Sequence, residues 1–146
     1  MDAKCVNPFI ESFTAVMPQL GFSNIRLGKL NAKSKEVTGS GVVVVLGIVG
    51  DIRGNVVYLM QTDSAKKIAS TMMMGMPIDE FDEMAGSAIS ELTNMLTANA
   101  ATCFSNIGIR VDISTPTMLQ GENMSVKMSS TSGTINFINS PNCLIV

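Results

Sequence analysis

Hydrophobic positions recur at helical spacing in three segments of the chain. Residues 6–20 repeat apolar side chains every three or four positions and stop at Gly21, which predicts an amphipathic helix. Asn7 and Pro8 are expected to form its cap and first turn. A short and a long helix are predicted further on, the first from Thr62 or Asp63 to Gly75 and Pro77, the second from Asp79 or Glu80 to Asn106, with Gly108 beyond it.

Strand patterns fill the rest of the chain. The valine-rich run Gly41–Val49 is too short to cross a bilayer as a helix, so it is interpreted as a buried strand. Turn residues 50–54 join it to a second strand, residues 55–61, as a hairpin, whereas residues 24–37 alternate only weakly. Three more strands are expected near residues 110–114, 124–129 and 133–138. This pattern predicts an α+β fold with two long helices and a shorter one on an antiparallel-rich sheet.

Length and composition predict one soluble domain over residues 1–146. The chain has 146 residues, of which 46% are hydrophobic, enough for a single core. The formal net charge is −2 and the ten Lys and Arg are scattered, which argues against a nucleic-acid partner. The first residues lack the apolar segment of a signal peptide. We therefore expect a cytoplasmic protein that does not enter a membrane.

The residue types present restrict the possible chemistry. Cys5, Cys103 and Cys143 are widely spaced and form no CxxC pair, which indicates reduced thiols rather than disulfides or a zinc site. Cys103 falls in an apolar helical pattern and is interpreted as a core residue. The chain has no histidine, so Ser-His and Cys-His nucleophile pairs are excluded. Any catalysis must use carboxylates, amides, hydroxyls or groups of a partner.

The cluster of methionines at residues 72–76 has two interpretations. Flexible thioether side chains suit an adaptable binding groove, but at helical spacing they more often fill gaps in a core. We favour the core interpretation.

The long predicted helix has two unlike faces. One broad apolar face is expected to pack on the sheet, and Asn99 lies toward it as a buried, hydrogen-bonded residue. No Lys or Arg occurs between residues 79 and 106, although solvated helices usually pair such residues with Glu. The opposite stripe combines a carboxylate and an amide with small residues that let another protein approach: Ser87, Glu91, Asn94 and Ala98.

Residues 87–95, Ser-Ala-Ile-Ser-Glu-Leu-Thr-Asn-Met, resemble the (Asp/Ser)-x3-Glu-x2-Asn signature of the CheC/CheX/FliY chemotaxis phosphatases. Segments 54–59, 69–75, 83–85 and 114–117, with Gly121-Glu122, resemble the family in the same order, and the match covers most of residues 39–122. CheC and FliY members carry a second Glu-x2-Asn pair on the first helix. Here Glu11 is followed by Thr14 instead, so the resemblance implies the single-site CheX type, and Glu11 is interpreted as a surface charge.

The resemblance implies hydrolysis of the aspartyl phosphate on a CheY-type response regulator. In this family the regulator supplies Mg2+ and a lysine, so the chain is expected to need no cofactor or metal of its own. Asn94 would orient the attacking water with its amide, which both donates and accepts hydrogen bonds. Glu91 would pair with the regulator's lysine. Glu91 and Asn94 are thus the expected catalytic pair, and Ser87 is assigned no role.

Three alternatives stay open at this point. The domain can bind the regulator without hydrolysing it, as a sink or scaffold, or it can be a structural interaction domain with an ordinary helix surface. An unrelated enzyme that uses Cys103 or Ser87 is disfavoured by the lack of histidine. The resemblance also implies a homodimer joined through sheet edges, with the apolar residues 134–146 packed in the interface or in an adjoining strand.

Overall fold

The computed structural model of the chain describes residues 3–22, 25–138 and 142–145, apart from the side chains of residues 29–35 and 128–145. Within them, three helices and five strands follow one another. Every pair of strands is antiparallel, so the predicted α+β fold is confirmed. The elements are α1 (Ala3–Gln19), β1 (Arg26–Gly50), β2 (Gly54–Met60), α2 (Thr62–Met72), α3 (Glu83–Asn106), β3 (Val111–Ile113), β4 (Thr117–Ile138) and β5 (Asn142–Ile145).

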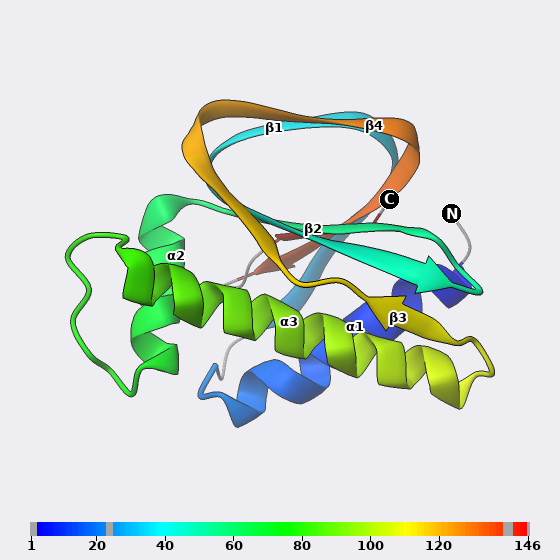
Figure 1. Cartoon of the computed structure of the whole chain (residues 1–146), viewed down its shortest axis with the longest axis horizontal. Helices are drawn as coiled ribbons and strands as arrows, with labels where there is room; N and C mark the ends of the chain where they lie inside the picture. Colours follow the sequence, from blue (N-terminus) through cyan, green and yellow to red (C-terminus); the bar gives the residue numbers. More distant parts are fainter. Residues whose placement is uncertain (1–2, 23–24, 139–141, 146) are drawn as a thin grey trace.

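The described strands form one sheet in the order β2-β5-β4-β1-β3, and β1 pairs with β2 as well. The long antiparallel pair of β1 and β4 therefore curls round until β5 meets β2, and it forms the arched ribbon of Figure 1. Register shifts along β1 and β4 bend this pair without ending it. For that reason the segments 124–129 and 133–138, predicted as two strands, are parts of the single strand β4, and β1 begins well before the predicted residue 41.

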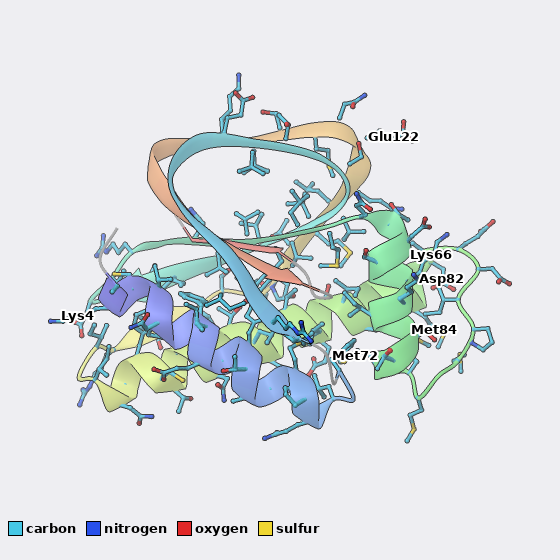
Figure 2. The ribbon with its side chains drawn as sticks, turned by 180° about the vertical axis from the view of Figure 1, so that it is seen from behind. Lys4, Lys66, Met72, Asp82, Met84 and Glu122 are labelled. Carbon is cyan, nitrogen blue, oxygen red and sulfur yellow. The ribbon has the colours of Figure 1, made fainter. Side chains whose placement is uncertain are left out.

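The valine run of β1 is buried on both faces of the sheet. Val42, Val44 and Leu46 belong to the main core, and α1 and α3 lie together along this side of the sheet (Figures 1 and 2). Val43 packs with Val57 in a second cluster on the opposite side. Because both faces are covered, the run is continuously apolar rather than alternating, and the prediction of a buried strand is confirmed.

Helix α3 is fixed to its neighbours by buried polar contacts as well as by packing. Ser12 of α1 donates a hydrogen bond to the backbone oxygen of Leu96 at 2.6 Å. The hydroxyl of Tyr58, on β2, lies 2.8 Å from that of Thr97, and all three polar side chains are buried. These contacts hold the middle of α3 at a defined height and rotation above the sheet.

The helix starts differ from the predictions. Helix α3 begins at Glu83 rather than near residue 79, because the Asp82 carboxylate caps it by accepting a hydrogen bond from the Ala85 N–H at 2.9 Å. Helix α2 begins at Thr62, preceded by Gln61 without a side-chain cap. Helix α1 begins at Ala3, so Pro8 lies inside it instead of at its first turn, with its ring buried against the core.

Candidate functional site

The middle of α3 presents its polar side chains away from the core. Ser87 and Glu91 are exposed and Asn94 is half-buried. Leu92 and Leu96 are fully buried against the sheet. The prediction of one apolar and one polar face is therefore confirmed.

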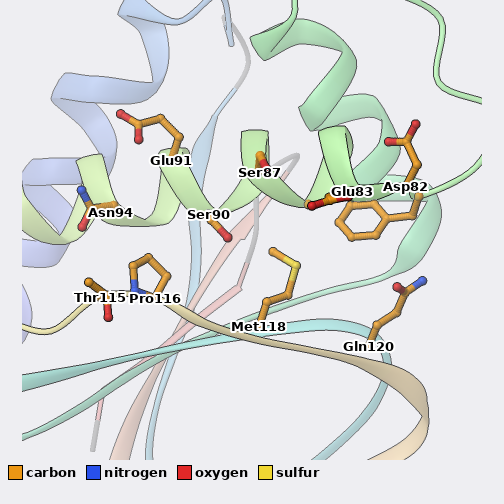
Figure 3. Close-up of a pocket in the computed structure, with 12 residues that line it drawn as sticks. Asp82, Glu83, Ser87, Ser90, Glu91, Asn94, Thr115, Pro116, Met118 and Gln120 are labelled. Atoms are coloured by element: carbon orange, nitrogen blue, oxygen red, sulfur yellow. The ribbon is translucent and has the colours of Figure 1, made fainter.

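A cleft of about 720 Å³ runs beside this polar face. The α3 side carries the Glu91 and Asn94 side chains, and the facing side is formed by the segment that leads into β4 (Figure 3). Among the described residues, three carboxylates and no Lys or Arg line the cleft. The lining residues are Phe81, Asp82, Glu83, Gly86, Ser87, Ser90, Glu91, Asn94, Thr115, Pro116, Met118 and Gln120.

The wall opposite Asn94 is held in place by Ser114. The Ser114 N–H donates to the Gly47 oxygen at 2.9 Å, and the Ser114 hydroxyl accepts from the Gly47 N–H at 2.8 Å. This two-way clamp to β1 fixes the next two residues, Thr115 and Pro116, in front of α3 (Figure 3). The distance between the two walls is thus set by β1 pairing rather than by a free loop.

Gly86 of α3 lies against two side chains that line the cleft. A Cβ atom added to Gly86 would meet the Met118 sulfur at 3.5 Å and the Phe81 ring at 3.9 Å. Met118 points toward the helix at this level in Figure 3. Both are ordinary van der Waals distances, so Met118 and Phe81 pack close to the helix at Gly86 and leave room for one methyl group.

Neither Glu91 nor Asn94 has a hydrogen-bonding side-chain partner among the residues that the structure describes. The hydroxyls beneath them are engaged within the helix: Thr93 donates to the Ser90 oxygen at 3.0 Å, and Thr97 donates to the Thr93 oxygen at 2.7 Å. The carboxylate and the amide are consequently available to a ligand or partner, on a helix that is itself rigidly supported.

Cys103 is half-buried rather than a core residue. Burial raises the pKa of its thiol, and the nearby Glu11 carboxylate raises it further by its charge and by a hydrogen bond. A thiol with a raised pKa is a poor nucleophile, which weighs against an enzyme that uses Cys103. Glu11 is exposed as predicted, and Asn99 is half-buried with its side-chain oxygen 3.8 Å from the Cys103 sulfur.

The core interpretation of the methionine cluster is wrong for two of its members. Met72 and Met73 are half-buried, but Met74 is 99% exposed and Met76 is 50% exposed. Helix α2 ends at Met72 and Gly75 turns the chain back, its N–H donating to the Ser70 oxygen at 2.8 Å. Met74 and Met76 follow the end of the helix and therefore leave the face of α2 that packs on the core.

The described part of the chain contains no group of three or more His, Cys, Asp or Glu side chains placed to hold a metal ion. None of its helices is both long and apolar enough to cross a membrane.

Sequence reasoning assigned no role to the residues of the facing wall. Thr115 and Pro116 were part of a matched segment, but Met118, Gln120 and Phe81 carried no signal at all. Met118 and Gln120 follow the clamp between Ser114 and Gly47, a pairing across 67 positions of the chain that places this wall opposite α3. A periodicity within one segment cannot reveal such a contact.

Comparison with known proteins agrees with this arrangement. Residues 42–138 match the family described as chemotaxis phosphatase CheX. The CheY-P phosphatase CheX of Thermotoga maritima is 36% identical over 128 residues, which span 87% of this chain and 82% of that protein. The chemotaxis protein CheX of Vibrio vulnificus shares the fold, with a TM-score of 0.84 at 24% identity over 98% of this chain and 97% of that one.

A solved complex is similar as well. The CheX-CheY-BeF3-Mg2+ complex from Borrelia burgdorferi has a TM-score of 0.73 at 26% identity, covering 96% of this chain and 94% of that chain. The family match covers most of the chain and includes α3, the cleft and its facing wall. This chain belongs to the CheX family of chemotaxis phosphatases.

Proposed function

We propose that this chain dephosphorylates a CheY-type response regulator in chemotaxis signalling, with Asn94 and Glu91 as its catalytic pair. The observation that carries the proposal is the cleft beside α3, which is lined by a fixed wall and by an amide and a carboxylate that have no side-chain partner among the described residues. The 36% identical relative from Thermotoga maritima is a CheY-P phosphatase. The whole of residues 1–146 is taken as one phosphatase domain, since the Vibrio structure covers 98% of the chain.

The electrostatics of the cleft indicate which groups the partner must bring. The described residues that line it include Asp82, Glu83 and Glu91 but no Lys or Arg, so the cleft would repel a phosphoryl group that carried no cations with it. Cations must accompany it. The Borrelia complex contains CheY with Mg2+, and we propose that the regulator likewise supplies Mg2+ and a lysine here. When bound, the metal ion neutralises charge on the phosphoryl oxygens.

Asn94 is proposed to position the attacking water. Its amide can donate a hydrogen bond to a phosphoryl oxygen and accept one from the water, which holds the water in line with the bond to be broken. The water oxygen bonds to phosphorus and the P–O bond to the regulator's aspartate breaks. The products are a free carboxylate and inorganic phosphate, and no side chain of this chain needs to change its charge.

Glu91 is proposed to set the register of docking. It is exposed one helical turn before Asn94, so a lysine paired with its carboxylate would bring the phosphoryl group to the level of the amide. The contact is charge-assisted and partly solvated. We therefore expect its loss to weaken binding more than the chemical step.

The test is the loss of phosphate from a phosphorylated, Mg2+-bound CheY-type receiver. The wild-type chain should accelerate it, and Asn94→Ala should lower kcat by about 10² or more while binding is kept, since one positioned polar group at a reacting centre contributes on that scale. Ser87→Ala is the matched control, because Ser87 is exposed on the same stripe and has no proposed role. A wild-type chain that binds the receiver without accelerating its decay would establish a binding module instead.

We also propose that the protein is a cytoplasmic homodimer. β3 ends the strand order of the described sheet, so its outer edge is open to a second copy, and the neighbouring Val49 of β1 is 55% exposed. The predicted packing of the apolar side chains of residues 134–146 lies outside the described residues. Cys5 and Cys103 are free thiols, which suits a reducing compartment. Sedimentation as a monomer at micromolar concentration would refute the dimer.

A further inference from the structure

The segment between α2 and α3 encloses a second depression beside the phosphatase cleft. This methionine hollow has a volume of about 450 Å³. It lies where the chain turns back from α2 toward the first turn of α3. Its lining combines apolar side chains with three carboxylates: Met73, Met76, Pro77, Ile78, Asp79, Glu80, Asp82 and Met84.

Two of the methionines in this hollow are largely exposed. Met84 is 57% exposed and Met76 is 50% exposed. Neither belongs to the main core, whose side chains have almost no exposed surface. Half-exposed long apolar side chains contribute little to the free energy of folding. A group of exposed apolar side chains that lie together marks an interaction site more often than a single exposed apolar side chain does. Methionine is also the side chain best able to adapt its shape to a partner.

The hollow is continuous with the proposed docking face. Met84 precedes Glu91 by seven residues, which is close to two helical turns, so both side chains leave α3 in nearly the same direction about 10 Å apart along the axis. Asp82 lines both the cleft and the hollow. Figure 2 shows Asp82 and Met84 together at the start of α3, beside α2. A globular partner seated on Glu91 and Asn94 therefore extends over Met84.

The charged residues among those that line the hollow are all acidic. No Lys or Arg occurs between Lys67 and Arg110, whereas five acidic residues do. All five line the cleft or the hollow: Asp79, Glu80, Asp82, Glu83 and Glu91. A partner that fits this surface carries an apolar side chain ringed by Lys or Arg, and carboxylates of this density steer such a partner during approach.

We propose that the methionine hollow is a second docking point for the phosphorylated receiver, where Met76 and Met84 take up an apolar receiver side chain flanked by basic residues. The inference rests on the proposed function, because the receiver is placed by Glu91 and Asn94. The residues that select the partner would then lie on a part of the surface that does not contact the phosphoryl group. Receivers that share the same phosphorylation chemistry are then distinguished by what they present to Met76 and Met84.

The test compares Met84→Gln and Met76→Gln with Ile107→Gln. Ile107 is a matched control, because it is 53% exposed and flanks the far end of α3. The dissociation constant is measured for a receiver charged with beryllofluoride and Mg2+, and KM and kcat are measured with the phosphorylated receiver. Urea unfolding of all three variants checks that the fold is kept.

Met84→Gln and Met76→Gln are each expected to raise the dissociation constant and KM by about fivefold, about 1 kcal/mol at 1.4 kcal/mol per factor of ten, with kcat unchanged. Ile107→Gln should leave the dissociation constant, KM and kcat as they are in the wild type. Raising the salt concentration should slow association for every variant. If the wild type dephosphorylates the receiver while both methionine variants bind like Ile107→Gln, the hollow is not a docking point and the proposed function still stands. If the wild type has no activity, the proposed function itself fails.

Discussion

The Tyr58→Phe substitution tests the buried polar contact that supports α3 beneath the cleft. Tyr58 has no exposed surface and Thr97 is 1% exposed. Thr97 has a single hydroxyl hydrogen, which it donates to the Thr93 oxygen at 2.7 Å. The 2.8 Å contact between the two hydroxyls must therefore have Tyr58 as its donor. Phenylalanine removes this donor and leaves the ring in place.

The cost follows from the hydrogen bond that is lost. A neutral hydrogen bond contributes a net of about 1 kcal/mol, and a buried acceptor left without its donor costs about 1–3 kcal/mol. Thr97 keeps its bond to Thr93, so the lower part of that range applies. We expect Tyr58→Phe to lower the free energy of unfolding by about 1–2 kcal/mol, and Tm by roughly 3–6 °C in a domain of this size.

Urea denaturation of four proteins measures this contact. They are the wild type, Tyr58→Phe, Thr97→Val and the double variant, and the m-value should be the same for all of them. The free energy of unfolding of the double variant should fall by less than the sum of the decreases in the two single variants, with a difference of at least about 0.5 kcal/mol. The reason is that the contact can be removed only once. Additive losses, or a loss below about 0.3 kcal/mol for Tyr58→Phe, would refute a stabilising contact between the two hydroxyls.

Two further predictions concern α3 and its neighbours. Gly86→Ala should raise the free energy of unfolding by about 0.5–1 kcal/mol, because alanine favours the helix more than glycine does. The added methyl group has room, since it meets the Met118 sulfur at an ordinary contact distance of 3.5 Å. A lower free energy of unfolding in urea denaturation would contradict this prediction. Glu11→Gln should speed alkylation of the Cys103 thiol at pH 8, as measured by mass spectrometry of the peptide that contains Cys103. Burial raises the pKa of this thiol and the Glu11 carboxylate raises it further, so removing the carboxylate should lower the pKa. An unchanged rate of alkylation would show that burial alone controls the pKa of the thiol.

The architecture could be predicted in outline because its helices and its central hairpin are encoded locally. Apolar residues at helical spacing predicted all three helices, and the valine run with its following turn predicted the pairing of β1 with β2. The helix starts were less predictable. Asp82 rather than a residue near 79 caps α3, since that choice depends on which carboxylate can reach a free N–H in the folded chain.

The long curled pair of β1 and β4 could not be predicted from alternation. Its register shifts break the period of two, so a single strand resembles two short ones. The exposure of Met76 and the partial exposure of Cys103 were missed for a related reason. Periodicity does not show that α2 ends at Met72, before Met76, nor how far another element covers the face of α3 that carries Cys103.

By itself, the sequence determined the helix that carries Glu91 and Asn94 on one polar stripe, because the spacing of three residues within a helix sets their relative direction. Its resemblance to a family also indicated a hydrolytic mechanism that uses no histidine of this chain. Only the tertiary structure decided that Thr115 and Pro116 face this stripe, because Ser114 is hydrogen-bonded to Gly47 on a distant strand. Likewise, only the fold brings Met76 and Met84 beside the cleft, since a long-range arrangement is determined by which surfaces pack together and not by any local pattern.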